Sequence, residues 1–168
     1  MPRFTPFDAF SRATFPSGFT AAVFLLRLII GILFFWSGFS KLFGEPAWSA
    51  APYLLSASGP FAEFFKAMAG LAVIDGLNVW GQLLIGSALL LGLCVRPAAF
   101  FGAIMMVFYY LAHFEQNIMN GYVDLHVILF FVFLLFMFGG FGHVNGLDSL
   151  LEHHPRWQGR GFVRYLFG

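Results

Sequence analysis

The stretch FTAAVFLLRLIIGILFFWSGFSKLF, residues 19–43, decides the fold class, because Arg27 is its one charged residue before Lys41. A helix needs about 20 predominantly apolar residues to cross the hydrocarbon core of a bilayer. None of the apolar runs alternates with polar residues as the strands of a membrane barrel do. The sequence therefore predicts an all-α membrane protein, a four-transmembrane-helix bundle. The three other runs are residues 77–95, 97–114 and 125–142.

The composition supports the bilayer as the main partner of this chain. Of its 168 residues, 60% are hydrophobic, 20% aromatic and 10% charged, against about 25% charged residues in soluble domains. A net charge of +1 gives no reason to expect a nucleic-acid partner. Cys94 is the single cysteine, and the sequence holds no haem, iron–sulfur or metal motif. Electron transfer would therefore need a bound, non-covalent quinone or the cofactor of a partner.

The distribution of Lys and Arg predicts the orientation. The first apolar run is too long for a cleaved signal, so an uncleaved anchor is expected. Basic residues favour the cytoplasmic side, which places both termini inside (N-in/C-in) and leaves Lys41 and Lys66 outside. The expected localisation is the prokaryotic cytoplasmic (inner) membrane, with several crossings. The basic residues expected inside are Arg3, Arg12, Arg96, Arg156, Arg160 and Arg164.

Three parts of the chain are expected on this basis. Residues 1–18 form a cytoplasmic segment, residues 19–148 the membrane domain, and residues 149–168 a basic aromatic tail. The tail is interpreted as an ordinary positive-inside anchor, with anionic lipid binding as the alternative.

The outer loop, residues 44–75, is expected to carry an interfacial helix at residues 61–74, FAEFFKAMAGLAVI. One face of that helix would be apolar and lie over the mouth of the bundle. The turn at Arg96 is expected to place Pro97 at a first helical position. Glycines inside the first two runs are interpreted as packing devices rather than cavity residues. They are Gly31, Gly38, Gly81, Gly86 and Gly92.

Polar residues of all four runs gather at the predicted outer end. Ionisable groups inside a membrane are functional candidates by default. Asp75, Asn78 and Gln82 share one face of the second helix because of their spacing. Lys41 ends the first helix. The third helix contributes Tyr109 and His113, and the fourth begins with Asp124 and His126.

Several of these residues also have a purely structural interpretation. Asp75 and Asp124 are placed where a carboxylate would cap a helix, and Lys41 would reach the interface by extending its side chain. The two histidines are either satisfied hydrogen-bonding residues or part of a site that protonates a ligand. Gln82 lies about 10 Å further in than Asp75 by helix rise. That depth excludes capping and indicates a pocket.

Arg27 needs a partner because an unpaired charge at its depth costs several kcal/mol. A structural ion pair with Asp148 is the favoured interpretation. Backbone carbonyls at the glycine-rich end of the fourth helix, or an oxygen of a ligand, are the alternatives.

Four segments resemble the DoxX/DoxD family, whose members are four-helix membrane bundles. They are RLIIGILFFWSGFSKLF (27–43), GQLLIGSALLLGLCVRPAAFFG (81–102), DLHVIL (124–129) and GGFGHVNGLD (139–148). The resemblance covers roughly residues 20–148. The stretch WSAAPYLLSASGPFAEFF, residues 48–65, is most similar to the large subunit (DoxD) of thiosulfate:quinone oxidoreductases. That resemblance implies oxidation of thiosulfate to tetrathionate with electrons passed to quinone, and a second redox subunit.

Two functions follow as hypotheses. In the catalytic one, a quinone headgroup enters from the outer leaflet and hydrogen-bonds to His113, His126 or Tyr109. Asp124 or Asp75 accepts protons, and Lys41 with Lys66 attracts an anionic donor such as thiosulfate. The other residues assigned to quinone or substrate binding are Asn78, Gln82 and Trp36. In the non-catalytic hypothesis the chain is an accessory or structural subunit of a larger electron-transport complex.

Overall fold

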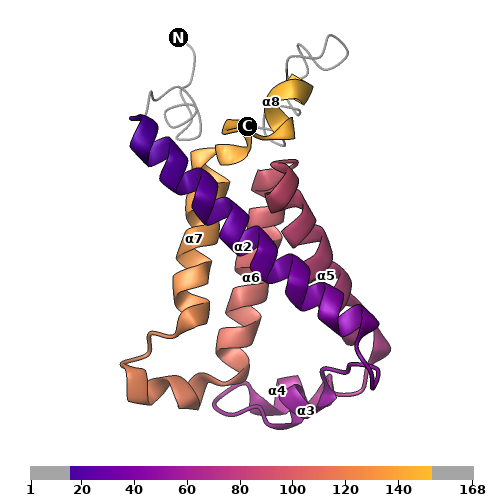
Figure 1. Ribbon diagram of the computed structural model, residues 1–168. Coiled ribbons are helices and arrows are strands. Elements are labelled where there is room, and N and C mark those ends of the chain that lie inside the picture. Colours follow the sequence, from indigo (N-terminus) through magenta and orange to yellow (C-terminus); the bar gives the residue numbers. More distant parts are fainter. Residues whose placement is uncertain (1–15, 153–168) are drawn as a thin grey trace, which may run out of the picture.

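A computed structural model describes residues 16–152, and their regular secondary structure is helical (Figure 1). The predicted all-helical class is therefore confirmed for this range. Residues 1–15 and 153–168 of the predicted terminal segments, with Arg3, Arg12, Arg156, Arg160 and Arg164, lie outside the described residues. The elements are α2 (Ser17–Phe43), α3 (Ala51–Leu55), α4 (Ala62–Ala67), α5 (Ala72–Leu91), α6 (Val95–Ala112), η1 (Phe114–Asn120), α7 (Leu125–Gly139), η2 (Phe141–His143) and α8 (Leu147–Glu152).

Within the described range, three helices are long and apolar enough to cross a membrane, namely α2, α5 and α6. The fourth predicted span, α7, is apolar but has only 15 residues. Its helix ends at Gly139 because Gly140 adopts a left-handed conformation with φ 62°. The protein is therefore a multi-pass membrane protein with three spans shown by length and composition.

The turn between α5 and α6 lies earlier in the sequence than predicted. Helix α5 ends at Leu91 because Gly92 is left-handed, with φ 62°, and closes the helix with its backbone N–H. Cys94 is also left-handed, with φ 53°, and precedes α6. Pro97 is thus the third residue of α6 rather than its first. That position still lies in the first turn, where a missing N–H is tolerated.

The predicted interfacial helix over residues 61–74 is wrong in its extent. Helix α4 covers only Ala62–Ala67, and the chain turns at Gly70, whose φ of 80° is left-handed, before α5 begins. The preceding short helix, α3, was not predicted. Phe65 of α4 and Leu54 of α3 are buried together with Ala112, the last residue of α6. Helices α3 and α4 therefore cover the end of α6.

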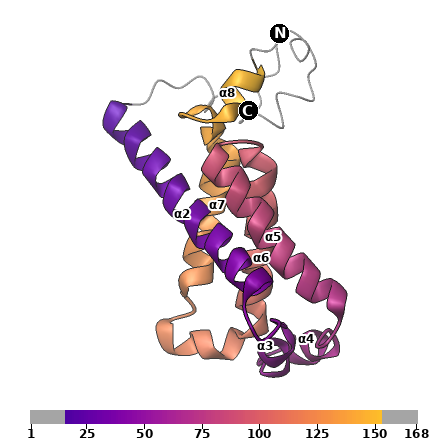
Figure 2. The same ribbon diagram turned by 45° about the vertical axis from the view of Figure 1, so that its right-hand side comes forward.

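Close helix contacts explain most of the glycines. Helix α2 packs along α5, and α6 packs along α7 (Figures 1 and 2). A Cβ atom at Gly38 would lie 2.8 Å from the backbone N of Leu83, and one at Gly86 would overlap the backbone of Phe35. The packing interpretation is confirmed at these two positions. Gly92 serves instead as the left-handed cap described above.

Aromatic side chains fill the centre of the bundle. Phe34 of α2 meets Phe133 of α7 edge to face, with ring centroids 5.1 Å apart. Leu89 and Phe136 are also fully buried there. Figure 1 shows α3 and α4 at one end of the bundle and α8 with the start of α2 at the other. These two ends are called the α3 end and the α8 end below.

Candidate functional site

Lys41 organises the polar residues at the α3 end. Its Nζ atom donates to Asn78 Oδ1 at 2.7 Å and to Gln82 Oε1 at 2.9 Å. It also lies 4.3 Å from the centre of the Trp48 ring, in a cation–π geometry. Ser37 Oγ donates to the same Gln82 oxygen at 3.0 Å. Lys41 thus binds two side chains of the neighbouring helix instead of extending freely to the interface.

Tyr109 brings α6 into the same network. Its hydroxyl oxygen accepts a hydrogen bond from Asn78 Nδ2 at 2.5 Å and another from Gln82 Nε2 at 3.2 Å. Gln82 is only 5% exposed, as its predicted depth requires. We call the set Ser37, Lys41, Asn78, Gln82 and Tyr109 the polar cluster. It connects α2, α5 and α6 inside the apolar bundle.

Tyr53 and His113 lie beside the polar cluster. The Tyr53 hydroxyl donates to the backbone oxygen of Tyr109 at 3.2 Å, and the Tyr53 ring meets the His113 ring at 4.3 Å. Burial raises the pKa of Tyr53 to about 12, with smaller contributions from Tyr109 and Asp124. The Tyr53 hydroxyl therefore stays protonated at neutral pH.

His113 is held in an apolar setting. Both of its ring nitrogens are buried, and neither makes a hydrogen bond within the described residues. Burial lowers the pKa of His113, the nearby Tyr53 backbone carbonyl opposes this shift, and His126 reinforces it. His113 is therefore held in its neutral form.

Asp124 and His126 form a hydrogen-bonded pair at the start of α7. Asp124 Oδ1 accepts from the backbone N–H of Val127 at 3.0 Å and so caps the helix. Its Oδ2 atom lies 2.5 Å from His126 Nδ1. Burial alone would raise the pKa of Asp124, but the hydrogen bonds from His126 and Val127 outweigh it and lower that pKa. The His126 ring meets the Tyr109 ring edge to face at 5.6 Å.

Three predicted site residues lie apart from the polar cluster. Asp75 does not cap α5, contrary to the favoured expectation, because it lies within the first turns of that helix. Its side chain instead accepts a hydrogen bond from the backbone N–H of Ala50 at 2.7 Å, which ties the start of α3 to α5. Trp36 is 66% exposed on α2 and stacks on Phe39. Lys66 pairs with Glu63 at the surface, with a 3.0 Å contact.

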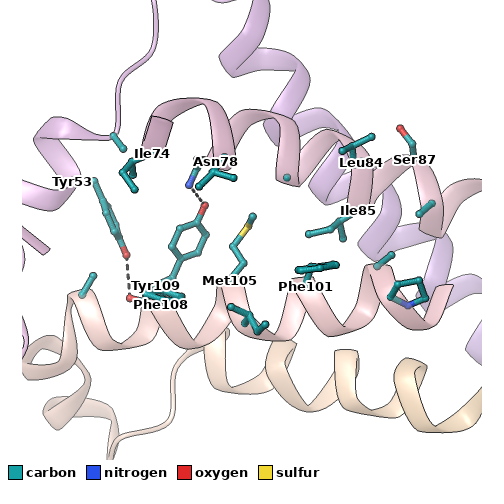
Figure 3. A pocket seen from close by; sticks show the side chains of 18 of the residues that line it. Tyr53, Ile74, Asn78, Leu84, Ile85, Ser87, Phe101, Met105, Phe108 and Tyr109 are labelled. Carbon is teal, nitrogen blue, oxygen red and sulfur yellow. Dashed lines mark hydrogen bonds between the residues drawn. The ribbon is translucent and has the colours of Figure 1, made fainter. Parts of the chain in front are cut away.

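An apolar groove leads from the polar cluster along α5 and α6. Its volume is about 770 Å³, and it runs from Tyr53 and Ala112 at the α3 end, past Asn78 and Tyr109, to Cys94 and Pro97. Figure 3 shows Met105 and Phe101 between those ends, with the Tyr109 hydroxyl directed to Asn78. Sequence analysis did not predict this groove. Gly81, Ser87 and Ala88 on α5, all lining it, were the available signal.

A second, more polar hollow opens on the other side of Lys41. Its volume is about 570 Å³, and its wall includes Glu45, Trp48, Asp75 and Trp80. Lys41 is therefore shared by this hollow and the polar cluster. Among the described residues, no group of three or more His, Cys, Asp or Glu side chains is placed to hold a metal ion.

Arg27 and Asp148 belong to a separate buried cluster at the α8 end. Arg27 is fully buried, and its guanidinium donates to the backbone oxygens of Phe141 at 2.7 Å and Asn145 at 3.3 Å. Asp148 attracts Arg27 electrostatically, but its two oxygens accept from the backbone N–H groups of Cys94 and Val95. The described residues thus contain no direct hydrogen bond between the predicted ion-pair partners.

Cys94 is unsuited to thiol chemistry. Burial, followed by the nearby Asp148, raises the pKa of the Cys94 thiol. A raised pKa disfavours the thiolate, which is the reactive form.

Comparison with known families matches residues 22–114 to the DoxX family. The chain belongs to the DoxX family. The match covers more than half of this DoxX protein, from the second turn of α2 through α5 and α6 to His113 and Phe114. It therefore includes the polar cluster and both walls of the groove. No curated protein and no solved structure matches the chain.

Proposed function

We propose that this DoxX protein is the membrane subunit of a quinone-linked oxidoreductase. The observation that carries the proposal is the groove between α5 and α6, which is apolar along its length and reaches Tyr109 and Asn78 at the α3 end. Such a shape suits a molecule with a long apolar tail and a polar head. An isoprenoid quinone is the membrane electron carrier with that form.

The size and lining of the groove support this ligand class. Small-molecule sites have volumes of about 300–1,000 Å³, with mostly apolar walls and a few placed polar groups. The groove, at about 770 Å³, lies within this range, and Tyr53, Asn78 and Tyr109 supply polar groups near its α3 end. The headgroup would lie beside Tyr109, and the tail would follow α5 and α6 towards Cys94.

Proton transfer is the chemistry that the chain's own residues offer. Reduction of a quinone to a quinol consumes two electrons and two protons. His126 contacts the Tyr109 ring, and Asp124 holds His126 through its carboxylate. These side chains would pass protons between the headgroup and the aqueous edge. We assign the electrons to the cofactor or substrate of a partner subunit.

Thiosulfate is the donor suggested by the resemblance of residues 48–65. Two thiosulfate ions would give one tetrathionate and the two electrons that reduce one quinone. Lys41 and Lys66, the expected attractors of this anion, already have partners in the polar cluster and in Glu63. We therefore place the binding of the donor anion on the partner subunit.

A matched pair of variants tests the groove. Ile104 and Val107 are both on α6 and are 38% and 39% exposed, but only Ile104 lines the groove. Titration of purified protein with a decylubiquinone or menaquinone analogue should show weaker binding in Ile104→Trp and unchanged binding in Val107→Trp. Equal affinity in Ile104→Trp and the native protein would refute the proposed site.

One observation favours the accessory function as a second candidate. The hydrogen bonds among Lys41, Asn78 and Gln82 are made within the protein, as in a structural network that fastens helices. Gentle detergent extraction separates the two functions. Stoichiometric co-purification with a larger complex, together with no quinone binding by the isolated subunit, would favour the accessory function.

A further inference from the structure

The ammonium group of Lys41 fixes the orientation of two side-chain amides. An ammonium has three donors and no acceptor. It donates hydrogen bonds to Asn78 Oδ1 and Gln82 Oε1, and it also lies over the Trp48 ring. Turning either amide around would direct its NH₂ group at the ammonium. The amide oxygens of Asn78 and Gln82 must therefore face Lys41. The contacts with the ammonium thus decide which atom of each amide is the oxygen and which is the nitrogen.

The amide nitrogens consequently face Tyr109. Its hydroxyl oxygen accepts from Asn78 Nδ2 and from Gln82 Nε2. A hydroxyl has two acceptor lone pairs and one proton, so both lone pairs are used. Within the part of the chain that the structure describes, no atom accepts the remaining proton of Tyr109. A donor without a partner away from water is unfavourable, and a ligand oxygen can satisfy it.

The position of this proton coincides with the polar end of the groove. Tyr109 and Asn78 line the groove (Figure 3), whereas Lys41 and Gln82 are not among its lining residues. The neighbouring Tyr53 hydroxyl also lines the groove, but it already donates to the Tyr109 backbone oxygen. The hydroxyl proton of Tyr109 is thus available where the groove meets the polar cluster.

We propose that the Tyr109 hydroxyl donates a hydrogen bond to a carbonyl oxygen of an oxidised quinone in the groove, and that Lys41 is the positioning residue that directs this donor. The inference rests on the proposed function and adds the residue that recognises the headgroup. Lys41 acts through Asn78 and Gln82 without touching the ligand. A quinol oxygen carries its own proton and is a poorer acceptor than a carbonyl, so the oxidised form is preferred.

The frequency of the quinone carbonyl stretch reports this hydrogen bond directly. A quinone labelled with ¹³C at one carbonyl, bound to the full-length protein, is measured by isotope-edited infrared spectroscopy. The native protein should lower the frequency relative to the same quinone dissolved in lipid. In Tyr109→Phe the frequency should return towards the lipid value, and affinity should fall about fivefold, the usual effect of one hydrogen bond.

Lys41→Met tests the positioning role. Without the ammonium either amide can turn, so the Tyr109 proton can point inwards onto an amide oxygen. The carbonyl frequency should then rise as in Tyr109→Phe, although Tyr109 is still present. One control should leave the frequency unchanged, namely Tyr110→Phe, because the Tyr110 hydroxyl lies outside the polar cluster and donates to the Tyr122 backbone oxygen.

The outcomes separate this inference from the proposed function. Two results would overturn the role of Tyr109 and leave the proposed function standing. In the first, quinone binds the native protein but its carbonyl frequency equals that in lipid. In the second, Tyr109→Phe does not change the frequency of the bound quinone. A lowered frequency retained in Lys41→Met overturns the positioning role. Absence of any quinone binding to the native protein overturns the function itself. The measurement on the native protein decides the first point even where a variant fails to fold.

Discussion

Arg27 shows how this bundle accommodates a buried cation. Its guanidinium lies in the apolar interior and donates to the backbone oxygens of Phe141 and Asn145. Those oxygens belong to the segment after α7, which the left-handed Gly140 ends, and the Phe141 oxygen also accepts from the backbone N–H of Val144. The buried guanidinium of Arg27 therefore finds its hydrogen-bond acceptors in the segment that follows α7.

Replacing Arg27 with Met should destabilise the protein. The Asn145 carbonyl would lose its side-chain donor, and the Phe141 carbonyl would keep only the Val144 N–H, at a cost of about 1–3 kcal/mol. Thermal unfolding in detergent should show a lower Tm for Arg27→Met, and Arg27→Lys should recover part of the loss. An unchanged Tm in Arg27→Met would mean that these bonds contribute nothing to stability.

The lowered pKa of His113 predicts how the stability of the protein depends on pH. Burial lowers its pKa below the usual value, which is about 6.5. Between the lowered and the usual value, the unfolded state binds more protons than the folded one, so stability falls as the pH drops through this window. The lowered pKa of Asp124 acts in the same direction at more acidic pH.

The corresponding measurement compares Tm at pH 7.5 and pH 5.5. The native protein should be less stable at the lower pH, and His113→Phe should reduce the difference. The groups facing His113 are Tyr53 and His126, so His126→Phe should retain more of the pH dependence than His113→Phe. Identical pH dependence in the native protein and His113→Phe would contradict the account.

At the scale of elements, the contact between α2 and α5 depends on a missing side chain. A Cβ atom at Gly86 would overlap the Phe35 backbone, whereas Gly76 on the same helix has open space around it. Overpacking of this kind costs about 1–3 kcal/mol. Gly86→Ala should lower Tm by several degrees, and Gly76→Ala should not. Equal Tm values would show that the helices move apart without penalty.

The elements also show what sequence alone could and could not predict. The hydrophobic run around Arg27 predicted α2 closely because length and apolarity suffice for such a helix. The end of α5 and the start of α6 shifted because Gly92 and Cys94 adopt left-handed conformations. Periodicity does not report such local backbone choices. For the same reason the predicted helix at residues 61–74 broke at Gly70.

The sequence predicted Lys41, Asn78, Gln82 and Tyr109 as site residues, but it did not predict Ser37 or the geometry of the polar cluster. Spacing placed Asn78 and Gln82 on one face, but Gln82, expected to mark a pocket, does not line the groove. The hydrogen bonds that link Lys41 to both amides, and these to Tyr109, depend on how α2, α5 and α6 are placed in space. Tyr53 was missed as a site residue because it comes from the loop, whose fold the sequence did not predict.

At the scale of the whole molecule, we propose that α7 crosses the membrane and that the α3 end faces outwards. In a background of Cys94→Ala, an impermeant thiol reagent added to intact cells should label Glu115→Cys, which precedes α7. The same reagent should not label Leu147→Cys, which follows it. Both positions are at described parts of the chain with exposed side chains. Labelling of both variants, or of Leu147→Cys alone, would contradict this topology.

Photolabelling with an azido-quinone in native membranes tests the central claim most directly, because the azide on the ring marks the position of the headgroup. Mass spectrometry should find the adducts near Tyr53, Asn78 and Tyr109, and excess oxidised quinone should suppress them. Adducts confined to the exposed face of α2 around Trp36, or to the Cys94 end of the groove, would contradict a headgroup site at the polar cluster.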